Sequence, residues 1–142
     1  AVALGLAVPH LTATDVRRAR EVNDRMRNAL TRLDPAQFTR LNRRFHNILY
    51  TACPNRHILS ILEREWALLS TTRRSAFVFI PERAAESVQE HDDLLDMIED
   101  GRGIEEIERF ARDHRMQTAR RLLQHIGDNM PEPTAGTPGS TR

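Results

Sequence analysis

The chain has 142 residues, of which 39% are hydrophobic and 29% charged, a composition typical of one soluble globular domain with a single core. Its 21 basic and 20 acidic residues leave a formal net charge of +1, which excludes the strongly positive field of a stand-alone nucleic-acid-binding domain. All the basic residues are arginine, which excludes Schiff-base chemistry and a Walker-type phosphate loop, because both need lysine. A single cysteine excludes an internal disulfide, and no apolar run approaches the ~20 residues of a membrane span. We therefore expect a cytoplasmic, single-domain protein.

Helical periodicity with recognisable start and stop signals organises the first half of the chain. After an apolar, helix-like opening stretch, a capping-box-like start at Thr12 predicts a helix that continues to Leu33. Asp34, followed by proline, ends that helix and caps the next, whose apolar stripe is predicted to end before Pro54. Asn55 is predicted to cap the helix that follows.

The second half continues in the same way. Phe77–Ile80 is the one β-like run, but it is short and ends at Pro81, which favours a helix end and connector over a strand. A helix is predicted over residues 82–100, with Gly101 as its stop. The last helix is predicted to begin near Gly103.

These elements predict an all-α fold, an antiparallel bundle of about six helices over residues 1–126. Residues 127–142 are rich in Pro, Gly, Ser and Thr and are predicted to form a disordered tail. Because the sequence opens at Ala1 within an apolar stretch, we expect it to be a fragment of a longer chain.

Three of the six histidines, His46, His91 and His114, fall in the apolar stripes of three different predicted helices. An antiparallel bundle can bring such residues to one interior point, where neutral imidazole binds Zn, Ni, Cu or Fe. Asn42 lies one turn before His46 on the same face and offers a carbonyl oxygen. The alternative is that the histidines are hydrogen-bonded core residues, and spacing alone does not decide between the two.

Four stretches resemble the FCD domain, the C-terminal effector-binding domain of FadR-type regulators in the bacterial GntR family. The stretches are Leu41–His46, Cys53–Asn55, Ser87–His91 and Ala111–His114. The family pattern is D-x3-H on one helix, then E-H, then a final His, and the resemblance covers roughly residues 1–126. It implies a helical bundle that holds a divalent metal, most often Zn or Ni, and senses a small carboxylate metabolite.

The resemblance also implies a homodimer in which an N-terminal winged helix–turn–helix, absent from this chain, binds operator DNA. No segment here resembles a recognition helix, so we expect no sequence-specific DNA binding by this chain itself. Asn42 stands where the family usually has Asp, so the negative charge that a divalent cation favours is missing. We expect a weaker metal site, a site completed by an anionic effector, or a metal-free variant.

An arginine that points inward could clamp a second carboxylate of the effector. Arg73 continues the apolar stripe that passes through Trp66, although a solvated helix end is the alternative for this residue. Arg74 and Arg83 are further candidates.

Two other functions remain open on the sequence: a three-His metal hydrolase or hydratase, and a metal-free helical interaction module. Against an enzyme, no general base is placed near the histidines by sequence. Glu90 is adjacent to His91, and neighbouring side chains leave a helix about 100° apart. The prediction is therefore a sensing and dimerisation domain of a regulator, not an enzyme.

Overall fold

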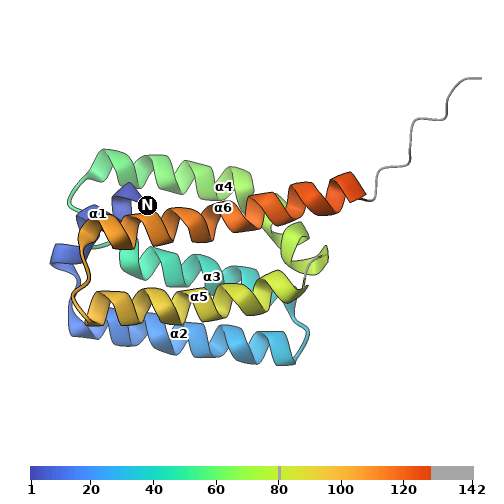
Figure 1. The fold of residues 1–142 in the computed structure, drawn as a ribbon, viewed down its shortest axis with the longest axis horizontal. Coiled ribbons are helices and arrows are strands. Elements are labelled where there is room, and N and C mark those ends of the chain that lie inside the picture. The colour runs from blue at the N-terminus through green and yellow to red at the C-terminus, as the bar shows by residue number, and fades with distance from the viewer. Residues whose placement is uncertain (80, 129–142) are drawn as a thin grey trace, which may run out of the picture.

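The computed structural model describes residues 1–79 and 81–128, apart from the side chains of 68–79, 81, 122 and 125–128. All regular structure in this part of the chain is helical. It comprises α1 (Val2–Ala7), the 3₁₀ helix η1 (Val8–His10), α2 (Ala13–Thr31), α3 (Pro35–Tyr50), α4 (Arg56–Phe79), α5 (Pro81–Glu99) and α6 (Ile104–Asp128). From α2 to α6, successive helices run in opposite directions along the long axis (Figure 1). The predicted all-α antiparallel bundle of about six helices is confirmed.

Two helices, α3 and α5, occupy the middle of the bundle and bring the others together (Figure 1). Helix α3 packs against α2, α4 and α1, while α5 packs against α2, α6 and α4. Helix α1 lies across the end of the bundle against α6 and α3. A side chain that points inward from α3, α5 or α6 therefore enters a shared interior.

The predicted helix starts are present as hydrogen-bonded caps. The backbone N–H of Asp15 donates to the Thr12 hydroxyl at 3.2 Å, and the Thr12 N–H donates to the Asp15 carboxylate at 3.0 Å. The Asp34 carboxylate accepts the N–H of Gln37 at 2.8 Å at the start of α3. Asn55 accepts two N–H groups from the first turn of α4, at 3.1 and 3.2 Å. Each cap satisfies backbone donors that the first turn of a helix leaves without partners.

The helix ends differ little from the prediction. Gly101 follows α5 with a φ of +67°, a conformation that glycine adopts without steric cost. Phe77–Phe79 belong to α4, so this apolar run is helical, while Ile80 lies outside the described residues. Helix α6 continues to Asp128, two residues into the segment predicted as a tail, and residues 129–142 lie outside the described part.

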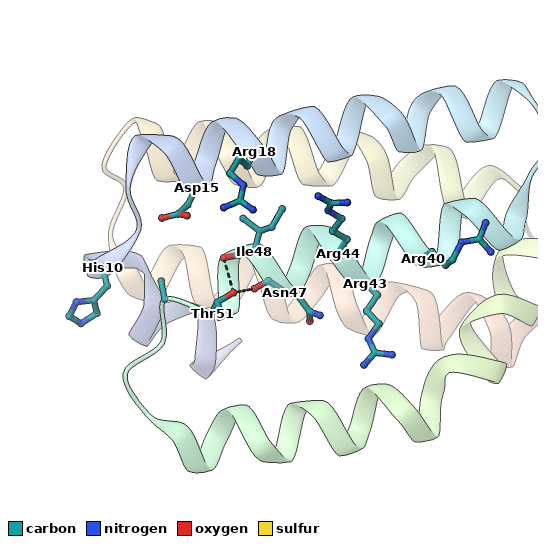
Figure 2. A pocket seen from close by; sticks show the side chains of 10 residues that line it. His10, Asp15, Arg18, Arg40, Arg43, Arg44, Asn47, Ile48 and Thr51 are labelled. Carbon is teal, nitrogen blue, oxygen red and sulfur yellow. Dashed lines mark hydrogen bonds between the residues drawn. The ribbon is translucent and has the colours of Figure 1, made fainter.

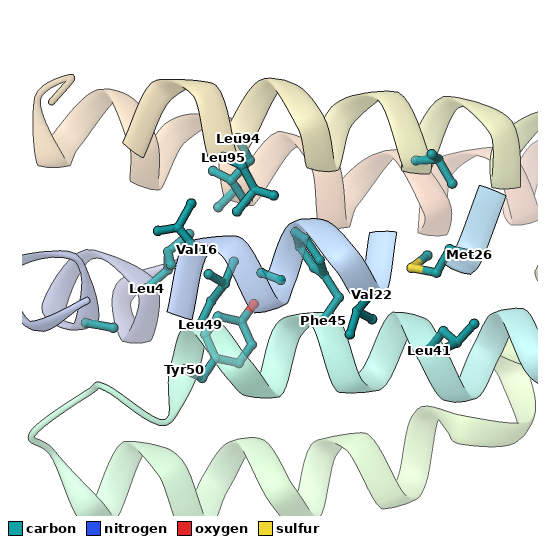
Figure 3. Close-up of a cluster of buried hydrophobic side chains, with 14 of the residues drawn as sticks. Leu4, Val16, Val22, Met26, Leu41, Phe45, Leu49, Tyr50, Leu94 and Leu95 are labelled. Carbon is teal, nitrogen blue, oxygen red and sulfur yellow. The ribbon is translucent and has the colours of Figure 1, made fainter. Parts of the chain in front are cut away.

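The core is built from aliphatic and aromatic side chains, mainly of α2, α3 and α5, with further residues from α1 and α6 (Figure 3). Polar side chains are buried beside it: Asn23, Asn42, His46, Arg83, Ser87, His91 and His114. Buried polar groups need hydrogen-bond partners or a ligand. A cluster of them inside an apolar core is therefore a candidate functional site. None of the described helices combines the length and the apolar character needed to cross a bilayer.

The cap of α2 makes a pH-dependent contribution to stability. Hydrogen bonds from the Thr12 side chain and backbone hold the pKa of Asp15 below its ordinary value of 3.8. Such a carboxylate stabilises the fold fully above its ordinary pKa, and the contribution is lost as the pH falls through the lowered value.

We therefore expect Asp15→Asn to be less stable than the wild type at pH 7, with a smaller difference at about pH 2.5. Urea denaturation of both proteins at the two pH values measures this difference. A difference that does not change with pH would show that the Asp15 charge plays no part.

Candidate metal centre

Three histidines from three helices meet in the interior of the bundle. Nitrogen atoms of His46 on α3, His91 on α5 and His114 on α6 all lie within 4.8 Å of one another. The ring centroids are separated by 5.0 Å (His46–His91), 4.8 Å (His91–His114) and 5.5 Å (His46–His114). The exposed fractions of the three residues are 2%, 0% and 7%. The structure thus brings together the three histidines that the sequence analysis singled out.

The orientation of His91 is set by Asn23 on α2. The Asn23 side-chain NH₂ donates to the Val88 carbonyl at 2.9 Å and to the Asp92 carboxylate at 2.8 Å. Its oxygen therefore faces Nδ1 of His91, at 3.0 Å. Because this oxygen can only accept, the proton of the neutral imidazole sits on Nδ1, and the lone pair is on Nε2.

His114 is held in the same manner by Glu90. The carboxylate lies 2.5 Å from Nδ1 of His114, and it also accepts a hydrogen bond from Arg83. Arg83 is fully buried, and it donates further to the Thr118 hydroxyl and to the His114 carbonyl, each at 3.2 Å. A carboxylate that accepts from one ring nitrogen orients the other towards a metal and makes it a better ligand.

The electrostatics favour the protonation states that metal binding requires. Burial lowers the pKa of His114, the charges of Arg83 and Arg115 lower it further, and Glu90 opposes them. Burial alone would raise the pKa of Glu90, but hydrogen bonds from His114 and Arg83 outweigh it and hold that pKa below its ordinary value. The result is a neutral imidazole beside an ionised carboxylate, so no proton has to leave His114 before it can bind a cation.

The expectation that Glu90 lies away from the histidines is wrong for His114. Glu90 and His91 do diverge around α5, as neighbours on a helix must. However, α6 packs against α5 and presents His114 to the side on which Glu90 emerges. The contact depends on packing between helices, which the spacing within one helix does not reveal.

Asn42 is a further buried polar residue on the helix that carries His46. It is 2% exposed and lies one turn before His46 on α3, as the sequence predicts. Its side-chain oxygen is buried and accepts no hydrogen bond from the described part of the chain. Leaving a buried acceptor unsatisfied costs about 1–3 kcal/mol, so this oxygen fits the role of a ligand atom.

Aromatic side chains form the walls of the centre. Phe45 stacks on the ring of His91 with centroids 3.9 Å apart and planes 12° apart. The rings of Tyr50 and Trp66 lie 5.7 and 5.6 Å from His46. These walls keep the surroundings apolar, which strengthens electrostatic interactions inside.

The donor set fits a divalent transition metal. Three imidazole nitrogens suit a divalent transition metal better than Mg or Ca, which prefer oxygen ligands throughout. Two nitrogen ligands of a tetrahedral zinc lie about 3.3 Å apart, given bonds of about 2.0–2.1 Å. The present separation of up to 4.8 Å is wider than this, so the histidines would have to approach one another to bind one ion.

Of the three arginines predicted to bind the effector, the structure describes the side chain of Arg83 alone. Arg73 and Arg74 lie on α4, where the side chains fall outside the described residues. Arg83 lies beside the centre, but its donors are engaged by Glu90 and the neighbouring acceptors on α6. These contacts favour a role for Arg83 in positioning Glu90 over a role in binding the effector.

Two residues near the centre were not singled out from the sequence. Asn23 interrupts the apolar stripe of α2, and that polar position among apolar ones is a signal that could have found it. Arg115 follows His114, and its guanidinium lies 5.6 Å from the Tyr50 ring and 5.4 Å from the Trp66 ring. Nothing in the sequence separates Arg115 from the other arginines of α6.

Comparison with known proteins gives one match. Residues 1–118 match the FCD domain family, a region that runs from α1 into α6 and contains all three histidines. Neither the curated proteins nor the solved structures contain a significant match. The chain therefore belongs to the FCD domain family, the effector-binding regulatory domains of GntR-type transcriptional regulators.

Proposed function

We propose that this chain senses a small carboxylate metabolite at a divalent metal, Zn or Ni, held by His46, His91 and His114. The observation that carries the proposal is the convergence of three buried histidines, two of which have Nδ1 held by acceptors within the protein. The Asn42 oxygen completes the protein ligands. A metal with these ligands keeps coordination positions open for the oxygens of a small molecule.

The charge balance of the site argues for an anionic ligand. Three neutral imidazoles and one amide oxygen leave the double positive charge of the metal uncompensated in a buried place. Glu90 is ionised, but Arg83 is bonded to it and offsets its charge. Arg115, half-buried over Tyr50 and Trp66, adds a further positive charge nearby. A carboxylate of the effector supplies the negative charge that Asn42 does not.

A sensing role fits the contacts of Glu90 better than a hydrolytic one. This carboxylate is the acidic group in contact with the histidines, and both His114 and Arg83 are bonded to it. It is therefore occupied as a positioning group and is poorly placed to take a proton from water. Our proposal is accordingly a regulatory domain and not a hydrolase.

The signal requires a second state that the effector binds differently. We propose that the chain acts as a homodimer in the cytoplasm, and that an effector shifts the arrangement of the two copies. Operator recognition then belongs to an N-terminal winged helix–turn–helix. Arg73, Arg74 and Arg115 are the candidates for a second carboxylate of the effector, and Arg83 positions Glu90.

The first test is metal content. Protein purified without chelator and without a polyhistidine tag should contain about one Zn or Ni per chain by plasma mass spectrometry. His46→Ala and His114→Ala should each lower that content, because each removes a ligand. His57→Ala, which changes an exposed histidine on α4, is the matched control and should retain the metal. Wild-type protein that takes up neither metal after incubation would contradict the proposed centre.

A second prediction concerns the group that orients His91. Asn23→Ala should weaken metal binding by about 10–100-fold, the usual effect of losing a partner of a metal-ligating histidine. Competition with a chromophoric chelator measures the affinity, and Asn28→Ala, at an exposed position of the same helix, is the control. Urea denaturation of the metal-free variant separates this effect from lost stability. Unchanged affinity in a folded variant would show that His91 does not depend on Asn23.

A third prediction tests the missing charge. Metal-loaded wild type should gain thermal stability from some members of a panel of small mono- and dicarboxylates, by about 2.7 kcal/mol at 100 times the dissociation constant. The corresponding neutral amides should have little effect. Asn42→Asp should bind metal more tightly and gain less from the same acids, because the protein then supplies the charge. Equal stabilisation by acids and amides would refute the charge argument.

A further inference from the structure

The charges of this protein are unevenly distributed, although their sum is only +1. Helix α3 carries Arg40, Arg43 and Arg44 and no acidic residue at all. On α2, Arg18 and Arg25 follow each other at an interval of seven residues, and Arg32 at the C-cap continues the series. Seven residues are nearly two helical turns, so these three lie along one line of about 21 Å. We call these six exposed residues the arginine face.

The arginines of the two helices line two clefts on the α2–α3 hairpin. A cleft of about 670 Å³ is lined by Arg18 from α2 and by all three arginines of α3. Figure 2 shows Arg18 and Arg44 directed into the groove between the two helices, with Arg43 on the other side of α3. A second cleft, of about 370 Å³, is lined by Arg25 and Arg32 near the start of α3. The arginine face thus extends over the whole α2–α3 hairpin.

Acidic residues are few on this face: Glu21 lies between Arg18 and Arg25 on α2, and Asp15 lies near Arg18. None of the ion pairs in that part of the chain involves any of the six arginines. Asp15 and Asp34, the acidic residues that line the two clefts, are engaged as helix caps.

The opposite flank of α2 shows the contrast. There Arg20 pairs with Asp96 at 2.8 Å and with Glu99, and Arg27 pairs with Asp92 at 2.6 Å, all on α5. Asp92, Asp96 and Glu99 of α5 are thus paired with α2 within the molecule. The six arginines of the arginine face are exposed and take part in no ion pair of the described residues, so their charge is available to an anionic partner.

We propose that the arginine face contacts the phosphodiester backbone of double-stranded DNA without reading its sequence. The planar guanidinium binds two oxygens of a phosphate at once, and arginine is favoured for such contacts. The charges are spread along about 21 Å instead of converging on one point, which fits a polyanion better than a single small anion. Contacts to the backbone position a protein on a duplex but do not select a sequence.

Other partners fit the face less well. Protein–protein contacts depend on large apolar or aromatic anchors in the interface, and the clefts are lined by polar and charged side chains with only Ile48 and small alanines between them. Leu33, at the turn of the hairpin, is the exposed large apolar side chain nearby. The inference rests on the proposed regulatory function, because a domain carried beside operator DNA meets flanking duplex. The test of DNA binding involves neither metal nor effector, so the DNA contact and the proposed metal-dependent sensing can fail separately.

The test uses this chain and a fluorescein-labelled 30-base-pair duplex of arbitrary sequence, with binding followed by anisotropy between 20 and 200 mM KCl. We expect the logarithm of the affinity to fall linearly with the logarithm of salt, by about 0.9 per phosphate contacted, hence a slope of about −3 to −5. The double variant Arg18→Gln, Arg44→Gln should bind more weakly, with a slope shallower by about 2.

The control is Arg102→Gln, Arg109→Gln, which removes the same charge from exposed positions before and on α6. It should leave affinity and slope unchanged. No binding at 20 mM salt, or equal losses in both double variants, would overturn the proposal. Stronger binding to vesicles with anionic lipid, lost in Leu33→Ser, would assign the face to a membrane instead. A change of sedimentation coefficient only in Arg18→Gln, Arg44→Gln would assign it to self-association.

Discussion

The hydrogen bonds at Nδ1 of His91 and His114 are the interactions on which the proposed metal centre depends. An imidazole has two nitrogens, and an unrestrained ring can present either of them to a ligand. Asn23 and Glu90 remove that freedom. Asn23 accepts from Nδ1 of His91 and Glu90 accepts from Nδ1 of His114, so in each ring Nε2 is the nitrogen whose lone pair can bind a metal. Asn23 reaches His91 from α2, while Glu90 reaches from α5 to α6. The centre therefore requires four helices in register, not only the three that carry the histidines.

Helix α2 connects this interior to the surface. Arg27 binds Asp92, Asp92 accepts from Asn23, and Asn23 accepts from His91. An exposed ion pair contributes little to stability by itself, but here it holds an amide that orients a buried ring. The other flank of the same helix carries part of the arginine face. A shift of α2 relative to α5 would thus act on the proposed metal centre and on the proposed DNA contact together.

The sequence predicted what is encoded locally. Caps at Thr12 and Asp34, the stop at Gly101 and the apolar periodicity all act within a few residues, so the helices could be located without the fold. The three histidines could be grouped because each lies on an apolar stripe, and apolar stripes of a bundle must face each other.

What the sequence could not predict depends on how helices pack. The contact between Glu90 and His114 joins residues on two helices, and only the packing of α6 against α5 creates it. The net charge of +1 is an average that conceals an uneven distribution, with arginines and no acidic residue on α3 but mostly acidic charges on α5.

The aromatic wall of the centre has an optical consequence. Trp66 is the single tryptophan of the chain, it is 5% exposed, and its ring lies 5.6 Å from that of His46. All indole fluorescence of the protein therefore originates beside the three histidines, in contact with the Arg115 guanidinium. A paramagnetic ion such as Ni²⁺ at this distance would quench the emission, whereas Zn²⁺ would only shift it. The chain thus contains its own spectroscopic reporter, which needs no label and distinguishes one metal from another.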